Sequence, residues 1–164
     1  MKESACPMTP AIRELKAASV RFTSHCFTYK EHGGAEQAAE ELGVPLHAVV
    51  KTLVMEAHGH DAKKTPLLIL MHGDKEVSTK QMARILGVKS VVPVAVPVVE
   101  KLTGYLPGGV SPFGTRHILP LYIEASILIL ETIFINGGKR GFLLGMSPND
   151  LVALKHPQPV EVAV

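Results

Sequence analysis

The sequence has no tryptophan, only two cysteines among its 164 residues, and an aromatic content of 5%. Cys6 and Cys26 form no CxxC pair and stand near no regularly spaced histidine pair, which argues against a disulfide scaffold and against a structural zinc site. Charged residues make up only 20% of the chain and the net charge is +2. This charge is too small for a protein that coats a nucleic-acid backbone, although it permits a local basic patch.

Long apolar runs are also missing. The most apolar stretch, residues 118–136, is interrupted by Glu124 and Glu131, so it is too polar to cross a membrane. The N-terminus lacks the apolar core of a signal peptide. A hydrophobic fraction of 46% with little charge excludes disorder. We therefore expect a cytoplasmic protein without membrane contact: a flexible tail over residues 1–8 and a single domain over residues 9–164.

Capping residues and hydrophobic periodicity predict short helices and strands in irregular alternation. Helices are expected from the cap Thr9 for about three turns, over 35–42, from the capping box at Ser78 to Gly87, over 97–102, and after the cap Ser147. Strands are expected over 20–29, 49–57, 66–72, 88–94, 119–123, 132–136 and 141–146. This irregular order predicts an α+β fold rather than a βαβ repeat.

Lys51 is the most informative single residue. It lies in the predicted strand 49–57, which is apolar on both faces and therefore typical of a strand buried on both sides. An ammonium group in such a place needs a partner or a ligand. The alternative is a lysine at a strand end that extends its amine to solvent.

Two glycine-rich segments are further candidates. In the segment 104–114, prolines restrict the backbone, while glycines let backbone groups approach a ligand closely. The segment 137–141 reads either as a hairpin turn with solvated basic residues or as a cationic edge that meets phosphate. An ordered surface turn is the alternative for the first segment, because no nucleotide-binding motif fits it.

Other chemistry is weakly represented. No Gly-x-Ser-x-Gly sequence is present, which excludes a serine hydrolase of that type. The residues 58–61 favour a polar hairpin turn over a metal site, and Cys26 is expected to be a small core residue. We predict neither a metal nor a cofactor.

Three segments, taken in order, carry a resemblance to a known family. They are VVKTLV at 49–54, TGYLPGGVSPFG at 103–114 and NGGKRG at 136–141. In this order and at these separations they are similar to the YbaK/EbsC family of aminoacyl-tRNA deacylases, whose fold also forms the editing insertion of bacterial prolyl-tRNA synthetases. The resemblance covers residues 9–154.

The resemblance implies a curved, mixed, partly barrel-like central sheet flanked by helices. It also implies a trans-editing hydrolase that removes cysteine from mischarged tRNA(Pro), and also from tRNA(Cys). A pocket built for proline discriminates only modestly against an amino acid of similar or smaller size, so the wrong ester is hydrolysed afterwards.

The resemblance also implies roles for individual residues. Lys51 and Gly108 are implied to be catalytic: Lys51 stabilises developing charge or grips the terminal phosphate, and backbone N–H groups near Gly108 form an oxyanion hole. The positions implied to bind the substrate are Tyr29, Tyr105, Gly109, Val110, Ser111, Pro112, Asn136, Gly137 and Gly138. Some cysteine-specific members have Ser and Asp where this chain has Asn136 and Leu143, a difference that bears on the amino-acid preference.

No acid–base pair or nucleophile stands near the three segments, which fits a substrate-assisted route in which the cysteinyl thiol attacks its own ester carbonyl. Two alternatives remain open. The first is a deacylase for another small amino acid, such as alanine on tRNA(Pro). The second is a non-catalytic module that binds a synthetase or aminoacyl ends. The expected partners are tRNA(Pro) and prolyl-tRNA synthetase.

Overall fold

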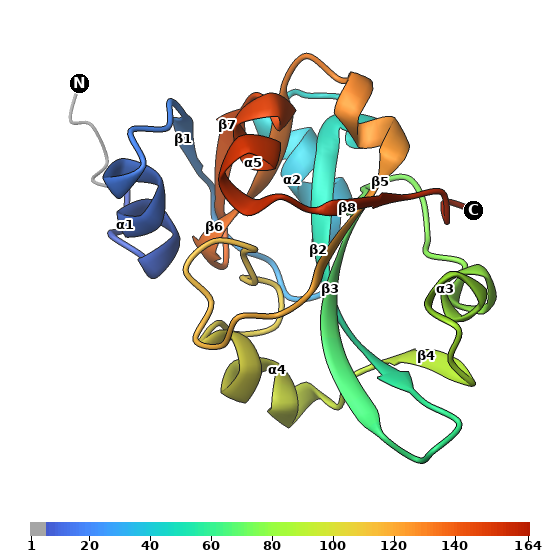
Figure 1. Cartoon of the computed structure of the whole chain (residues 1–164). Coiled ribbons are helices and arrows are strands. Elements are labelled where there is room, and N and C mark those ends of the chain that lie inside the picture. The colour runs from blue at the N-terminus through green and yellow to red at the C-terminus, as the bar shows by residue number, and fades with distance from the viewer. Residues whose placement is uncertain (1–5) are drawn as a thin grey trace, which may run out of the picture.

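The structure, a computed structural model, describes residues 6–164 (Figure 1). Its helices are α1 (Pro10–Ala17), α2 (Gly34–Leu42), α3 (Thr79–Leu86), α4 (Val96–Thr103) and α5 (Pro148–Lys155), with the 3-10 turns η1 (Leu46–Ala48) and η2 (Ala125–Ile129). Its strands are β1 (Thr23–Cys26), β2 (Val49–His58), β3 (Lys64–His72), β4 (Ser90–Pro93), β5 (Leu121–Glu124), β6 (Ile133–Lys139), β7 (Phe142–Met146) and β8 (Gln158–Val160). Residues 1–5 of the predicted tail lie outside the described residues.

All eight strands join one mixed sheet in the order β1-β7-β6-β2-β3-β5-β8, with β4 paired to β2. The pairs β1/β7, β6/β7, β2/β3 and β2/β4 are antiparallel, whereas β2/β6, β3/β5 and β5/β8 are parallel. The α1 helix packs beside β6 and α3 beside β4, so helices flank the sheet at both ends (Figure 1). The predicted α+β class with a mixed sheet is confirmed.

The sheet has hydrophobic clusters on both faces of its central strands. Leu68 and Leu70 of β3 belong to one cluster, while Leu67, Ile69 and Met71 belong to another. This alternation follows from the period of two in a strand. The sequence expectation that the strand around Lys51 has apolar neighbours on both faces is therefore confirmed.

The predicted helix caps are present. The hydroxyl groups of Thr9, Ser78 and Ser147 accept from backbone N–H groups of the first turns of α1, α3 and α5. Gly43 and Gly87 end α2 and α3 in the left-handed conformation. Among the residues described, no helix is long and apolar enough to cross a membrane.

Some boundaries were predicted wrongly. The first helix has eight residues, about two turns instead of three, and the first strand covers only residues 23–26 of the predicted 20–29. The strand β8 was not predicted, since it has three residues and one of them is Pro159.

Candidate functional site

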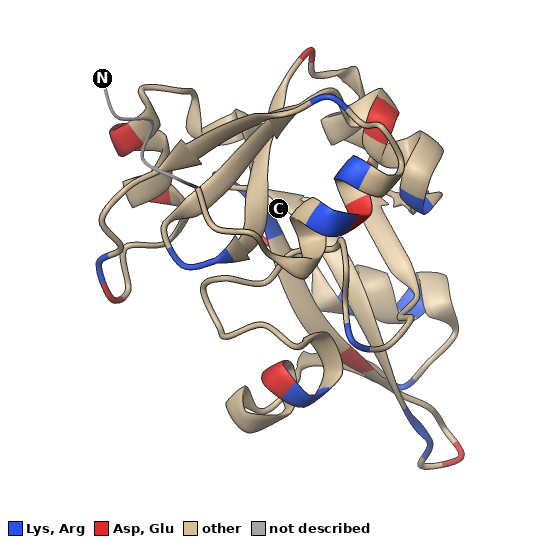
Figure 2. Ribbon diagram, turned by 90° about the vertical axis from the view of Figure 1, so that its left-hand side faces the viewer, with Lys and Arg blue, Asp and Glu red and all other residues tan. Residues whose placement is uncertain are grey.

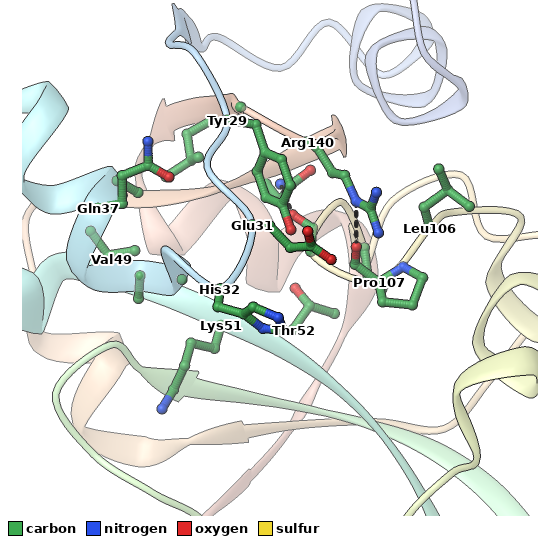
Figure 3. Close-up of a pocket in the computed structure, with 18 of the residues that line it drawn as sticks. Tyr29, Glu31, His32, Gln37, Val49, Lys51, Thr52, Leu106, Pro107 and Arg140 are labelled. Carbon is green, nitrogen blue, oxygen red and sulfur yellow. Dashed lines mark hydrogen bonds between the residues drawn. The ribbon is translucent and has the colours of Figure 1, made fainter.

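A cleft of about 890 Å³ opens beside β2 (Figure 3). Its walls come from five parts of the chain: the segment 27–38 that leads into α2, the start of β2, the helix α4, the glycine-rich segment after α4, and the β6–β7 hairpin. These parts are far apart in sequence. They meet because β6 pairs in parallel with the start of β2, at Val49 and Val50.

Five of the predicted site residues line this cleft, namely Tyr29, Lys51, Gly108, Val110 and Asn136. The other six do not line it, namely Tyr105, Gly109, Ser111, Pro112, Gly137 and Gly138. Ser111 is fully buried. The six residues therefore form the support behind the cleft wall and not its surface.

Tyr105 requires a correction, because the resemblance implied that it lines the pocket. Its side chain is only 4% exposed, and its hydroxyl donates to the carbonyl of Phe113 at 2.6 Å. Burial raises the pKa of Tyr105 to about 12, so it stays a neutral phenol. Its ring lies against the hairpin, where a Cβ on Gly138 would stand 2.7 Å from Tyr105 Cε1. Tyr105 therefore packs the glycine-rich segment against the hairpin from inside the core.

Hydrogen bonds fasten the glycine-rich segment to the hairpin. Asn136 Nδ2 donates to the Gly108 carbonyl at 3.2 Å, and Asn136 Oδ1 accepts from the N–H of Gly138 at 2.7 Å. Arg140 Nε donates to the Pro107 carbonyl at 2.8 Å (Figure 3). The two segments that the sequence marked separately thus form one wall.

Gly108 has a positive φ of 85°, which a glycine adopts without strain. A Cβ at this position would lie 3.0 Å from the Tyr29 hydroxyl oxygen. Tyr29 is in turn placed under Arg140, whose guanidinium carbon lies 5.2 Å from the ring centroid. The glycine therefore lets the loop close tightly on the aromatic ring.

The segment that carries Tyr29 is held by Gln37 of α2. Gln37 Oε1 accepts from the Lys30 N–H at 3.0 Å, and Gln37 Nε2 donates to the Thr28 carbonyl at 2.8 Å. A single side chain thus fixes the backbone on both sides of Tyr29. This role could not be predicted from the sequence, because a glutamine in a short amphipathic helix has no feature that marks such a contact.

Lys51 lies on the opposite side of the cleft from this wall. Its Nζ donates to the Lys75 carbonyl at 2.6 Å and lies 3.2 Å from Glu76 Oε1. In Figure 3 the ammonium group points away from Pro107 and Arg140. Because Glu76 is 80% exposed, this ion pair contributes only ~0–1 kcal/mol. Both partners of the ammonium group, Lys75 and Glu76, lie outside the cleft lining.

Thr52 is a cleft residue that the sequence reasoning missed. Its Oγ1 is buried, and no hydrogen-bond partner for it exists among residues 6–164. Burying an unpaired hydroxyl costs roughly 1–3 kcal/mol. A signal was available in principle, because Thr52 is a polar residue next to Lys51 in an otherwise apolar run.

One end of the cleft is apolar. Its lining includes Phe27, Ala38, Val49 and Leu143, and the last three are buried in one cluster. Small and aliphatic side chains leave room for a small group, and none of these four offers a charge. This end suits a methyl or a thiol better than a charged side chain.

Comparison with known proteins identifies the family. Residues 31–154 match the model of the aminoacyl-tRNA editing domain. The chain belongs to this family. The resemblance seen in the sequence is thereby confirmed, and with it the expectation of an editing enzyme.

Individual relatives agree with this assignment. The editing domain is 29% identical, over 98% of its length and 96% of the relative's, to EbsC of Enterococcus faecalis, provisionally named a Cys-tRNA(Pro)/Cys-tRNA(Cys) deacylase. It is 30% identical to a proline–tRNA ligase of Limosilactobacillus fermentum, over 65% of this chain and 19% of the ligase. A solved structure described as a candidate trans-editing enzyme for prolyl-tRNA synthetase has the same fold, with a TM-score of 0.78 and 23% identity, over 96% of this chain and 99% of that one.

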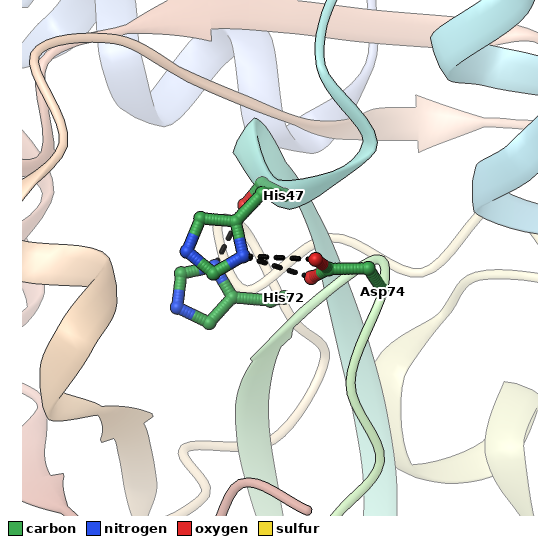
Figure 4. A group of neighbouring side chains, drawn as sticks. All are labelled: His47, His72 and Asp74. Carbon is green, nitrogen blue, oxygen red and sulfur yellow. Dashed lines mark hydrogen bonds and ion pairs between the residues drawn. The ribbon is translucent and has the colours of Figure 1, made fainter.

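The editing domain also contains a cluster of His47, His72 and Asp74 outside the cleft (Figure 4). The two imidazole rings stack with centroids 3.7 Å apart and an angle of 9°. The His72 nitrogens already meet the His47 carbonyl and the Ser126 hydroxyl, each at 2.7 Å. Since a metal ion lies in the plane of each imidazole that binds it, two parallel stacked rings cannot share one ion. The arrangement is a hydrogen-bonded support for the end of β3.

Two minor expectations can also be compared with the structure. Residues 59–63 form the turn between β2 and β3, so the expected hairpin is present, although His58 is the last residue of β2. Cys26 was expected in the core but is exposed, because β1 is an edge strand whose one neighbour in the sheet is β7.

Proposed function

We propose that this editing domain deacylates mischarged Cys-tRNA(Pro). The observation that carries the proposal is the cleft itself, which is lined by the start of β2 around Lys51 and Thr52, by the Gly108 loop and by a group of apolar residues, in a chain of the editing family. The named substrate of EbsC, the relative that spans nearly the whole chain, supports the same conclusion.

The cleft accommodates an aminoacyl ester in one orientation. The amino-acid side chain enters the apolar end near Ala38 and Leu143. The ester carbonyl lies by the Gly108 loop, where backbone N–H groups can stabilise an oxyanion. The N–H of Gly109 is already donated to the Leu106 carbonyl at 2.9 Å, so we assign this role to the N–H groups of Gly108 and Val110. The terminal nucleotide then lies near Arg140, and its phosphate meets Lys51 once the ammonium group leaves Glu76 and the Lys75 carbonyl.

The substrate supplies the nucleophile in this proposal. Neither Cys6 nor Cys26 lines the cleft, and none of the serines among residues 6–164 lines it. The cysteinyl thiolate attacks its own ester carbonyl, the C–O bond to the tRNA breaks, and the released 3′ oxygen takes up a proton. Water then opens the resulting cyclic thioester to free cysteine. The protein contributes orientation and charge stabilisation.

Methylation of the substrate sulfur tests this step, because it removes the nucleophile and keeps the ester. We expect no enzymatic hydrolysis of tRNA(Pro) charged with S-methylcysteine. We also expect little hydrolysis of Ser-tRNA(Pro), since a hydroxyl is far less ionised than a thiol at neutral pH. Rapid hydrolysis of S-methylcysteinyl-tRNA(Pro) would instead point to an activated water, with His32 at the cleft as the candidate base.

Alanine is the second candidate amino acid, because Leu143 contributes to the apolar end of the cleft and a methyl group suits apolar surroundings as well as a thiol does. A panel of tRNA(Pro) charged with cysteine, alanine, serine or proline separates these functions. Release of cysteine above the spontaneous rate supports the proposal, and preferential release of alanine favours the second candidate. Binding of aminoacyl-tRNA without release of any amino acid would show a non-catalytic module.

We further propose that prolyl-tRNA synthetase helps to select the tRNA. Basic and acidic residues are interspersed over the ribbon in Figure 2, and the net charge is only +2. Few phosphate contacts give weak binding to the tRNA backbone. The proposal predicts that adding the synthetase lowers the KM for Cys-tRNA(Pro) without changing kcat, whereas an unchanged KM would contradict it.

A further inference from the structure

The two cysteines of the chain lie side by side, away from the cleft. Cys6 precedes α1 and Cys26 is the last residue of β1, yet their Sγ atoms are 3.0 Å apart. Cys6 is half-buried and packs against the main hydrophobic cluster, whereas Cys26 is exposed. A small reagent in solution can therefore reach the pair through Cys26.

We propose that Cys6 and Cys26 form a reversible disulfide that locks the N-terminal segment onto the edge strand β1. The two sulfur atoms already lie at contact distance, so the bond needs only about an ångström of approach. No other cysteine exists in the sequence to compete for either partner. The structure thus assigns a redox modification site to a pair that the sequence places twenty residues apart.

The reaction requires an oxidant, for which we name a low-molecular-weight disulfide such as oxidised glutathione. One cysteine thiolate attacks a sulfur of that disulfide, forms a mixed disulfide and releases one small thiol. The second cysteine thiolate then attacks the protein sulfur of the mixed disulfide and releases the second small thiol. The protein loses two electrons and two protons, and one small disulfide becomes two thiols.

The rate of this exchange depends on pH. Desolvation of the thiol, followed by its hydrogen bond with Cys6, raises the pKa of Cys26 to about 11. Only the thiolate reacts, so the closure becomes faster as the pH rises from 7 to 9. At neutral pH the pair reacts slowly and responds to a sustained oxidising environment.

The disulfide would join two segments that both hold the hairpin of the cleft. The side chain of Thr9, three residues after Cys6, donates to the Gly137 carbonyl at 2.5 Å. The N–H of Phe27, next to Cys26, donates to the Gly141 carbonyl at 2.9 Å. The bond therefore fastens both sides of the β6–β7 turn without placing an atom in the cleft.

The test exposes the purified protein to oxidised glutathione at pH 8.5, with Cys6→Ser and Cys26→Ser as controls. We expect a monomer that loses both free thiols and two hydrogen atoms by mass. We also expect a melting temperature higher by on the order of 5–10 °C, because the bond closes a loop of about twenty residues. Dithiothreitol should reverse both changes, and neither control should show them.

Three results would overturn the proposal: two stable glutathione adducts on one chain, a disulfide between two chains, or an internal disulfide without a rise in melting temperature. These readouts do not involve tRNA, so they stand or fall independently of the deacylase proposal. Cys-tRNA(Pro) deacylation by the oxidised protein should stay within about twofold of the reduced protein, since neither cysteine lines the cleft.

Discussion

Replacing Thr52 by valine should make the protein more stable and less active. Valine has nearly the same shape as threonine and lacks the hydroxyl, whose Oγ1 is buried without a partner among residues 6–164. An unsatisfied buried hydroxyl costs roughly 1–3 kcal/mol, and we expect about 1 kcal/mol to be recovered, because the cleft lies close by. For a chain of this length, that gain raises the melting temperature by about 2–4 °C.

The same change should slow deacylation. The Thr52 hydroxyl is closed to solvent in the free protein and bonds the aminoacyl group only if the entering substrate uncovers it. Loss of that bond removes about 0.5–1.5 kcal/mol, which corresponds to a roughly 2- to 12-fold lower kcat/KM. Thermal melts measure the first effect, and deacylation of Cys-tRNA(Pro) under single-turnover conditions measures the second.

Thr65→Val is the matched control. Thr65 is an exposed threonine of β3, paired with Ala57 at the end of the hairpin distant from the cleft. This variant should change neither the melting temperature nor the rate. A Thr52→Val protein that is less stable than the wild type, or equally active, would refute the assignment of Thr52 to the substrate.

Two further predictions concern a glycine and a buried acid. Gly108→Ala and Gly87→Ala both place a side chain at positive φ, so each variant should lose ~1 kcal/mol of stability. Only Gly108→Ala should reduce deacylation at least tenfold, because its Cβ meets Tyr29. Equal rates for the two variants, measured on folded protein, would mean that the loop is only a turn. Glu124→Gln should destabilise the fold at pH 7, because Glu124 Oε1 accepts from the N–H groups of Val162 and Ala163. Burial acts to raise the pKa of Glu124, but these hydrogen bonds hold it below its usual 4.5. The stabilisation by the Glu124 carboxylate is therefore present above pH 4.5 and disappears as the pH falls through the lowered pKa of the folded state. The difference in free energy of unfolding between variant and wild type, measured with urea, should be smaller at pH 3 than at pH 7. A difference that is the same at both pH values would contradict this account.

The sequence predicted those parts of the fold whose causes are local. The capping box at Ser78 and the cap at Thr9 depend on a few neighbouring residues, and both are where they were expected. The strand β1 is shorter than the predicted strand 20–29 because only residues 23–26 pair with another strand, which is β7. Pairing of this kind depends on the distant strand and is invisible in a local pattern.

The site, like the fold, could be predicted from the sequence only in part. The ordered segments around Lys51, Gly108 and Asn136 marked the cleft, since a family resemblance carries information about distant contacts. It did not distinguish the wall from its support, because Tyr105 and Gly108 stand close in sequence while one faces the core and the other the cleft. The missing partner of Thr52 is likewise a property of the packed structure and not of the residue type.

The measurement that tests the central claim most directly is release of cysteine from Cys-tRNA(Pro) by the wild type, Lys51→Ala and Lys64→Ala. Lys51 lies at the cleft, whereas Lys64 begins β3 at its exposed end. Lys51→Ala should fold, because it loses only a pair with exposed Glu76 and a bond to the Lys75 carbonyl. Our account predicts rapid release by the wild type and Lys64→Ala, and a loss of at least tenfold for Lys51→Ala. Release by the wild type at only the spontaneous rate, or full activity of folded Lys51→Ala, would contradict it.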